Sequence, residues 1–315
     1  MATDSVSFEA PALSNNWGRW GADDQVGALN HLTGDVVRAA AGAVGQGRVI
    51  SLSLPIKGAT SSHAPCTVPH LPGRPLPQHF MSIDGADYLA GAKPPGGLSI
   101  ADDALVISPH GTSTHMDALC HMWSGKRLYN GHPSSRIRSY GAGRCGIENV
   151  PGIVTRGVLF DVAGHRGVDV LDGTDRITAA DLDEMERAAG VTIGTGDAVL
   201  LRTGWPTLFP AQRDRYWGGE PGLSTDGALW LADRDICAIA SDNSAISGLN
   251  AQGGADESID DDIHMICLWR HGIYLMEMLW LEELAAARQP TFLFAVAPLK
   301  IVGGTGSAIN PLAIL

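Results

Sequence analysis

Short apolar runs of strand length recur from Ala104 to the end of this chain, and they constrain its fold more than any other feature. The runs read ALVIS, RGVLFDV, AVLLRTGW, DICAIASDN and TFLFAVAPLKIV, and they are rich in Val, Ile, Leu and Phe. Segments this short and apolar favour strands of a sheet that is buried on at least one face. Helical patterns are fewer, so the sequence predicts an α/β protein with a mixed sheet and excludes an eight-unit TIM barrel.

Helix signals are present at three places in the chain. Thr178 can cap ITAADLDEMERAAG, because Asp181 stands three residues further on and can complete a capping box. A second helix is expected to begin at Ser224 or Thr225 and to continue through ALWLADR. A third is expected over residues 33–44, with a threonine as its cap.

The first 100 residues are the least regular part of the chain. RVISLSLPI alternates as a strand does, and a loop rich in proline and histidine follows over residues 61–78. A loop of that length is expected to line a site. Because no linker or fixed-period repeat interrupts the chain, we expect one domain over residues 1–315, with residues 1–100 packed on it as an irregular N-terminal extension.

Charge and cysteine content exclude several classes of protein. Lys+Arg 22 against Asp+Glu 34 gives a net charge of −12, which disfavours binding to nucleic acid or to an anionic membrane. No run reaches the roughly 18 apolar residues of a membrane span, and the N-terminus lacks a basic leader. The five cysteines form no CxxC pair, so a disulfide framework is not expected and a cytoplasmic location is.

One glycine-rich segment imitates a dinucleotide-binding fingerprint. GAGRCG places Gly141, Gly143 and Gly146 at the required spacing, and Asp161 ends the next apolar run. The fingerprint also needs a strand before it and a helix after it. Here HPSSRIRSY precedes the glycines and IENVPG follows them, so we interpret the segment as a plain turn.

The segment SPHGTSTHMDALCHMW concentrates groups that bind metals. It contains His110, His115, Asp117 and His121 within twelve positions. In an extended stretch His115 and Asp117 point to the same face, because side chains alternate with a period of two. Imidazole nitrogens and a carboxylate suit Zn²⁺ or Mn²⁺. The alternative interpretation is a loop whose polar residues satisfy one another.

A second group of candidate ligands lies in HMICLWRHGIYLMEMLWLEEL. His264 and Glu277 stand towards the two ends of this apolar segment. A carboxylate inside YLMEMLWL needs a partner, because an unpaired buried charge is costly. That partner is either a metal ion, with His264 as a further ligand, or an arginine such as Arg270.

At these residues the sequence resembles the cyclase family of metal-dependent hydrolases, which includes bacterial kynurenine formamidase and isatin hydrolase. The resemblance covers most of the chain, from WGADDQVGALNHLT through STHMDALCH and GKRLYNG to APLKIVGGTGSAINPLAI. It implies a swivelling β/β/α fold and hydrolysis of an amide at one or two divalent metal ions. It also implies homodimers or homotetramers.

The resemblance further implies a role for individual residues. His115 and Asp117 match the family's HxD ligand pair, and His121 matches the histidine that acts as catalytic acid and base. His264 and Glu277 match the family's later ligands.

One position departs from the family pattern. The family's first ligand stands four residues before the HxD histidine, where this chain has Gly111, and Ser113 replaces the motif glycine. His110 is one place too early. Either the loop bulges so that His110 still reaches the metal, or this subgroup lacks that ligand.

Together these features predict a hydrolase that uses metal-activated water to cleave a C–N bond of a small amide, lactam or formamide. His121, with an ordinary pKa near 6.5, would carry the proton to the departing nitrogen. His79, Trp123 and Tyr129 are candidates for shaping the substrate pocket. The alternatives are a lactone or ester hydrolase with the same site, and a non-catalytic relative that binds a metal or a small molecule.

Overall fold

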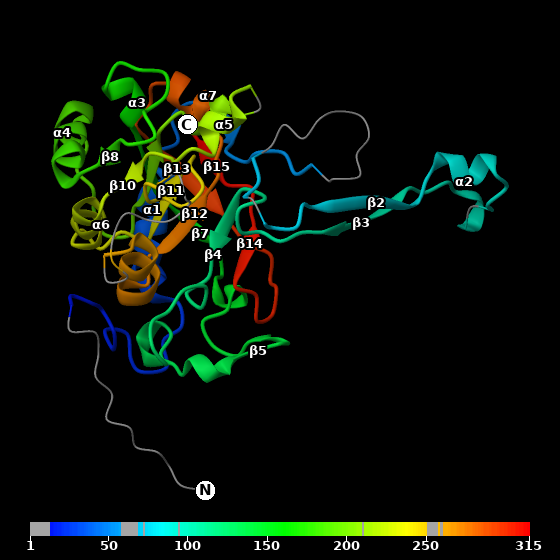
Figure 1. The fold of residues 1–315 in the computed structure, drawn as a ribbon, viewed down its shortest axis with the longest axis horizontal. Helices are drawn as coiled ribbons and strands as arrows, with labels where there is room; N and C mark the ends of the chain where they lie inside the picture. Colours follow the sequence, from blue (N-terminus) through cyan, green and yellow to red (C-terminus); the bar gives the residue numbers. More distant parts are fainter. Residues whose placement is uncertain are drawn as a thin grey trace, which may run out of the picture.

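A computed structural model describes residues 13–57, 69–71, 73–93, 95–209, 211–250, 258 and 261–315. A large sheet runs through the body, helices cover it, and a two-stranded arm projects away (Figure 1). Nine strands form this sheet in the order β1-β15-β13-β7-β9-β11-β12-β4-β14. Their bounds are β1 Val49–Ser51, β4 His115–Asp117, β7 Ile153–Asp161, β9 Ala198–Arg202, β11 Ala238–Ser241, β12 Tyr274–Glu277, β13 Thr291–Val296, β14 Gly306–Ala308 and β15 Leu312–Ile314.

The centre of the sheet is parallel and both of its sides are antiparallel. β7, β9, β11 and β12 pair in parallel, one with the next. All other neighbours in the nine-stranded sheet pair antiparallel. Every residue of β9 and β11 is buried, which is why AVLLRTGW and DICAIASDN contain near-continuous apolar runs. The predicted α/β fold with a mixed sheet is confirmed.

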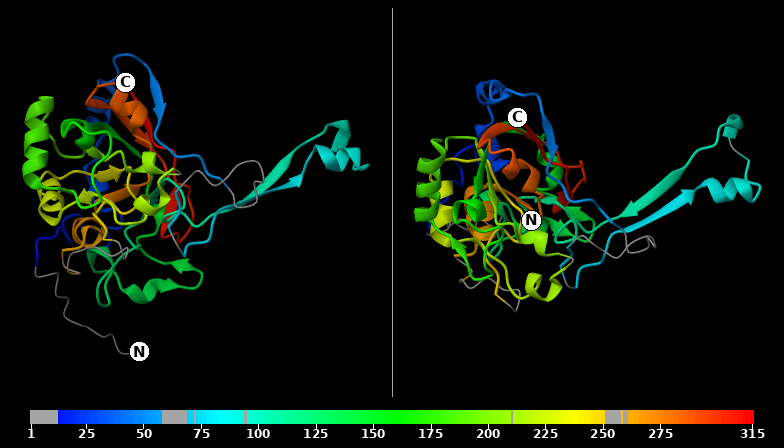
Figure 2. Two further views of the ribbon diagram at one scale, coloured as in Figure 1. Left: turned by 45° about the horizontal axis from the view of Figure 1, so that its top comes forward. Right: turned by 90° about the horizontal axis from the view of Figure 1, so that it is seen from above.

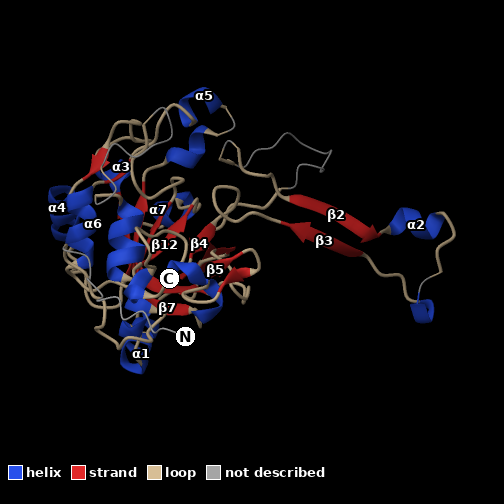
Figure 3. Ribbon diagram, turned by 60° about the horizontal axis from the view of Figure 1, so that its bottom comes forward, coloured by secondary structure: helices blue, strands red, loops and turns tan. Residues whose placement is uncertain are grey.

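The α-helices are short. Their bounds are α1 Gly34–Ala41, α2 Gly85–Leu89, α3 Val162–His165, α4 Ala179–Ala189, α5 Arg213–Tyr216, α6 Thr225–Ala232 and α7 Glu282–Ala286. Three of them, α1, α4 and α6, begin where the sequence predicts a helix start. Thr178 and Asp181 form the predicted capping box of α4, and Ser224 caps α6. α4 and α6 lie side by side (Figure 3), whereas α1 packs against β7 and β13.

Shorter elements complete the described part of the chain. The 3₁₀ turns are η1 Gly27–His31, η2 Pro95–Gly97, η3 Tyr129–Gly131, η4 Ser134–Arg136, η5 Ile147–Asn149 and η6 Trp205–Leu208, and η7 Met265–His271 is a π-helix. Three two-stranded sheets pair β2 Gln78–Ile83 with β3 Asp102–Val106, β5 Ile137–Arg138 with β6 Gly141–Ala142, and β8 Arg176–Ile177 with β10 Gly222–Leu223.

The structure corrects one strand prediction and agrees with the rejection of the glycine fingerprint. ALVIS was expected in the buried sheet, but it contributes to β3, whose partner is β2 in the projecting arm. Strand pairing, and not burial, explains its β-branched residues. GAGRCG contributes β6 and is followed by the 3₁₀ turn η5. Half of the loop over residues 61–78, namely residues 61–68 and 72, lies outside the described residues.

No helix within the described ranges combines the length and the hydropathy that crossing a membrane requires.

Candidate metal centre

Strands β4 and β12 create the centre by lying next to each other. They pair antiparallel, with Glu277 opposite His115 and Met276 opposite Met116. Because β4 is extended, His115 and Asp117 share one face, and the register places Glu277 beside them. Two histidines and two carboxylates, His115, His264, Asp117 and Glu277, therefore meet where β4 pairs with β12, although His115 and Asp117 lie far from the other two in sequence.

His115 is held in one orientation by its own backbone. Its Nδ1 lies 2.8 Å from the carbonyl oxygen of Ser113, to which it donates a hydrogen bond. Its Nε2 lies 3.1 Å from Glu277 Oε2 and 3.6 Å from Asp117 Oδ1. A backbone bond of this kind fixes the tautomer of a ligand histidine. It leaves Nε2 directed at the carboxylates.

His110 reaches the centre through a turn. Gly111 has φ of +72°, a left-handed conformation that favours glycine. The turn brings His110 Nδ1 to 2.9 Å from Asp117 Oδ1. On the neighbouring strand β14, a Cβ at Gly306 would lie 2.5 Å from the His110 ring. Only glycine at this position leaves enough room for the ring. The sequence left two alternatives open for His110. This turn corresponds to the first of them, in which a bulge of the loop brings His110 to the other candidate ligands.

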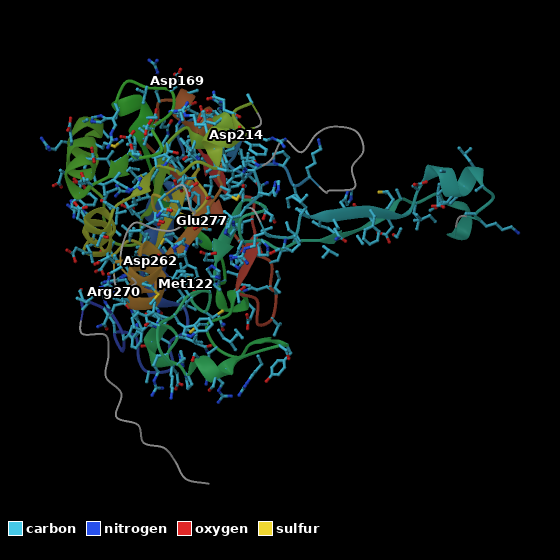
Figure 4. The ribbon with its side chains drawn as sticks, viewed as in Figure 1. Met122, Asp169, Asp214, Asp262, Arg270 and Glu277 are labelled. Atoms are coloured by element: carbon cyan, nitrogen blue, oxygen red, sulfur yellow. The ribbon has the colours of Figure 1, made fainter. Side chains whose placement is uncertain are left out.

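His264 approaches from the opposite side. It stands directly before the π-helix η7, and Asp262 Oδ1 accepts hydrogen bonds from the backbone N–H groups of His264 and Met265. His264 Nε2 lies 3.2 Å from Glu277 Oε1 and 3.7 Å from Asp117 Oδ2. Figure 4 shows Glu277 well away from Arg270. This arrangement favours the metal-ligand alternative for Glu277 over the arginine pair.

The donors form two triads that share Asp117. One consists of His110, His115 and Asp117, and the other of Asp117, His264 and Glu277, with all ligand atoms of each triad within 4.8 Å of one another. Asp117 Oδ2 and Glu277 Oε1 are buried, and neither accepts a well-aligned hydrogen bond, although His264 Nε2 lies near both. Two buried carboxylates this close to each other are costly unless a cation compensates them. The residues therefore fit a divalent metal ion.

The two carboxylates and the two histidines change one another's pKa values. Burial by itself would raise the pKa of Asp117 and of Glu277, but the surrounding histidines outweigh burial and lower both. Burial likewise opposes the charged form of His264, yet Glu277 and Asp117 raise its pKa to about 9. The pKa of His115 is raised in the same way. Without metal, protons on these histidines balance the carboxylates.

Metal binding is therefore expected to strengthen as pH rises. His264 has a pKa of about 9, above its ordinary value, so it holds a proton at neutral pH that a metal ion must displace. Displacement of one or two protons predicts an affinity gain of about tenfold to 100-fold per pH unit between about pH 6 and pH 8. Competition of the metal-free protein against a chromophoric chelator measures this slope. An affinity that does not change with pH would contradict the proton balance inferred for the centre.

His121 lies against the centre without belonging to either triad. Its ring stacks on that of His110, with centroids 3.9 Å apart and planes 8° apart, and its centroid lies 6.2 Å from that of His264. Burial lowers the pKa of His121 to about 4, and the neighbouring histidines act in the same direction. The sequence suggested an ordinary histidine pKa, whereas this environment keeps the imidazole neutral at pH 7.

The structure does not bring His79 or Tyr129 to the centre within one chain. His79 lies on the arm, where its Nε2 is 2.5 Å from Asp103 Oδ2. Tyr129 is fully buried, and its hydroxyl donates to Asn16 Oδ1 at 3.1 Å. Trp123 is exposed and follows His121 closely in the chain. A pocket role for these three residues stays a prediction.

Two residues that support the centre were not predicted. Thr305 Oγ1 lies 3.1 Å from His110 Nε2, so it fixes the far side of the ring. The backbone N–H of Leu71 donates to the carbonyl of Gly111 at 2.6 Å and anchors the turn. The glycine-rich GGTGSA segment around Thr305 was a signal that a backbone approaches closely there.

Comparisons with known proteins agree with this fold. The model of a family described as a putative cyclase matches residues 50–247. A solved structure described as a novel cyclase is 34% identical, covers 96% of this chain and 100% of its own, and has a TM-score of 0.85. Isatin hydrolase A from Labrenzia aggregata is 23% identical over 91% of this chain and 98% of its own, with a TM-score of 0.59. A predicted metal-dependent hydrolase from Bacillus stearothermophilus is 20% identical over 84% of this chain and 97% of its own, with a TM-score of 0.51.

The fold and the centre define an α/β protein with buried histidines and carboxylates arranged for divalent metal. The family match and the 34% identical structure place it more narrowly: the chain belongs to the putative cyclase family. The likeness to the isatin hydrolase and to the predicted hydrolase shows a shared fold. A search of curated proteins finds no match.

Proposed function

We propose that this protein is a metal-dependent hydrolase that cleaves a C–N bond of a small amide, lactam or formamide. The observation that carries the proposal is the pair of triads joined at Asp117, with the neutral imidazole of His121 stacked beside them. Membership of the putative cyclase family supports a hydrolase. Among proteins of the same fold, one structure is an isatin hydrolase bound to the product analogue thioisatinate, which makes a small cyclic amide the first substrate class to test.

The chain offers ligands for one or two divalent ions. His110, His115 and Asp117 would hold one, and Asp117, His264 and Glu277 would hold the other. Such an ion supplies Lewis-acid chemistry, which polarises a carbonyl and acidifies a water molecule. Zn²⁺ and Mn²⁺ both accept this mixture of nitrogen and oxygen donors.

His121 is the residue that we assign to proton transfer. With a pKa lowered to about 4 by burial, it is neutral at pH 7 and can take a proton from the attacking water. The same nitrogen would then return that proton to the departing nitrogen of the substrate, which leaves as an amine. The stacked His110 ring holds His121 in place for both transfers.

The test is hydrolysis of a small panel by the purified protein loaded with Zn²⁺ or Mn²⁺. The panel contains isatin, an N-formyl arylamine, an aryl lactone and an aryl ester, and product formation is followed by absorbance and mass spectrometry. We expect faster turnover of the amides than of the esters, loss of activity with a chelator, and recovery when metal is restored. The metal content measured in parallel gives the number of ions per chain.

Each other result points to a different function. Preference for the lactone or ester would replace the C–N assignment with an ester hydrolase at the same centre. Metal binding without turnover of any panel member would favour a non-catalytic relative. A protein that binds no divalent metal in the presence of intact His115 and Asp117 would contradict the proposal as a whole.

A further inference from the structure

The π-helix η7 ends in carbonyl groups that a distant part of the chain satisfies. The last carbonyls of a helix have no partner inside it. Here residues 16–28, the N-terminal segment, run beside the helix (dark blue and orange in Figures 1 and 2) and donate to four consecutive carbonyls at its C-terminal end. The bonds are Trp17 Nε1 to Trp269 O at 2.6 Å, Asn16 N to Arg270 O at 3.1 Å, Asn16 Nδ2 to His271 O at 2.5 Å, and Ala28 N to Gly272 O at 2.9 Å.

The N-terminal segment and the end of η7 also fit each other in shape. Gly27 has φ of +56° and Gly272 has φ of +60°, and a Cβ on Gly27 would lie 2.6 Å from the Gly272 carbonyl oxygen. Both positions therefore favour glycine. The rings of Trp17 and Trp269 pack edge to face, with centroids 5.1 Å apart and planes at 84°. The contact thus combines hydrogen bonds, close backbone approach and aromatic packing.

On its other side the N-terminal segment is anchored to Asn130. The Oδ1 atom of this buried residue accepts from the Gly18 N–H at 2.8 Å. Its Nδ2 donates to the carbonyls of Gly21 and Asp24 at 2.9 and 3.0 Å. His132 Nε2 donates to the same Asp24 carbonyl at 2.9 Å. The N-terminal segment therefore joins η7 to the part of the chain that follows β4.

The conformation of η7 decides where His264 lies. His264 stands directly before η7, and its Nε2 is 3.2 Å from Glu277 Oε1. A π-helix is rare and occurs mostly at functional sites, and its hydrogen bonds span one residue more than those of an α-helix. Relaxation of η7 towards an α-helix would rotate its start against its end. Because Tyr274 N–H donates to the Cys237 carbonyl at 3.1 Å and β12 pairs with β11, the end is fixed and the start, with His264, would move.

We propose that the N-terminal segment holds η7 in its π form, and that Trp17 and Asn16 are positioning residues for His264 that act through the helix from its opposite end. The proposal rests on the proposed function in one respect, namely that His264 is a metal ligand. Loss of the bonds from Trp17 or Asn16 would free the helix end while leaving every candidate ligand in the chain.

Amide hydrogen exchange of the metal-free protein tests whether the N-terminal segment holds the helix. Trp17→Phe keeps an aromatic ring but removes the Nε1–H donor. We expect the amides of η7 to exchange about threefold to tenfold faster, the effect of one lost hydrogen bond. Peptides from β9, whose residues are all buried, should exchange as in wild type. Asn16→Ala removes the donor to His271 and should act in the same direction, so it carries the same measurements if Trp17→Phe fails to fold.

The affinity for Zn²⁺ alone, measured by competition with a chromophoric chelator, tests whether His264 is positioned. We expect both variants to bind zinc about tenfold more weakly, the lower end of the cost of losing a ligand's support. A variant that is only less stable keeps the native affinity while it is folded, so the affinity reports the position of His264. Trp230→Phe is the matched control, because its Nε1 donates to Asp183 Oδ1 at 2.8 Å, between α6 and α4. It should change neither the exchange of η7 nor the zinc affinity.

Unchanged exchange in η7, or unchanged zinc affinity in both variants, would overturn the proposal while leaving the proposed function intact, because wild type still binds zinc. Faster exchange throughout the chain, β9 included, would also overturn it, since the N-terminal segment would then support general stability only. A wild-type protein that binds no zinc would contradict the proposed function itself, and His264 would have no ligand role for the segment to position.

Discussion

Asp117→Asn is expected to weaken metal binding by at least about 100-fold and to abolish hydrolysis, because loss of an outer-shell partner alone costs 10–100-fold. Asp117 is the residue shared by both triads, so a single substitution affects every ligand set that the structure contains. Asparagine keeps the shape of the side chain but removes its charge and one acceptor oxygen. Metal content after dialysis and turnover of the best panel substrate measure the two effects.

The control for this substitution is Asp169→Asn. Asp169 is exposed and lies at the periphery, well away from Glu277 (Figure 4). The Asp169→Asn variant should keep wild-type metal content and activity. The metal-induced rise in melting temperature should persist in this control and disappear in Asp117→Asn, since a ligand stabilises only a protein that binds it. Equal metal content in both variants would refute the role assigned to Asp117.

His121→Ala is expected to lower kcat by about 10²-fold to 10⁴-fold, the usual contribution of a general acid and base, while metal content stays at the wild-type level. The structural reason is that His121 stacks on His110 but belongs to neither triad. Steady-state kinetics and metal analysis of the same preparation separate the two roles.

His165→Ala provides the comparison for His121. His165 ends α3 at the surface, where its Nε2 lies 3.3 Å from Glu184. Its removal should leave kcat and metal content unchanged. If His121→Ala loses metal together with activity, His121 is a support or a ligand of the centre and not a proton carrier.

Local signals in the sequence were sufficient to predict the elements that depend on residues next to one another in the chain. The capping box of Thr178 and Asp181 involves contacts within a few residues, and the apolar runs of β7, β9 and β11 are each visible as consecutive residues of the sequence. The metal-binding groups were recognisable for a similar reason, because His110, His115, Asp117 and His121 are concentrated in one segment.

Non-local pairing could not be predicted from the sequence. The antiparallel register that sets Glu277 opposite His115 joins strands far apart in the chain. Whether His110 reaches Asp117 depended on the left-handed turn at Gly111 and on the space that Gly306 leaves. ALVIS was apolar enough for the core, but its place in the arm is set by its pairing with β2.

The contact made by Tyr129 could not be predicted either. As a bulky residue it was a candidate for shaping the pocket, and nothing in the sequence indicated that its hydroxyl donates to Asn16 in the N-terminal part of the chain. A bulky aromatic ring usually packs in the core. The hydrogen-bond partner of its hydroxyl then depends on which segment of the chain packs beside it.

The position of β4 has a consequence for the order in which this protein becomes active during synthesis. β4 spans residues 115–117, yet its two neighbours are β12 at residues 274–277 and β14 at residues 306–308. Thr305, which contacts His110, leaves the ribosome with β14. The ligands at His110, His115 and Asp117 are therefore translated early and wait through most of elongation for the strands that enclose them. The centre can close only after nearly the whole chain has been synthesised. A chain released early therefore carries exposed ligands without a working site.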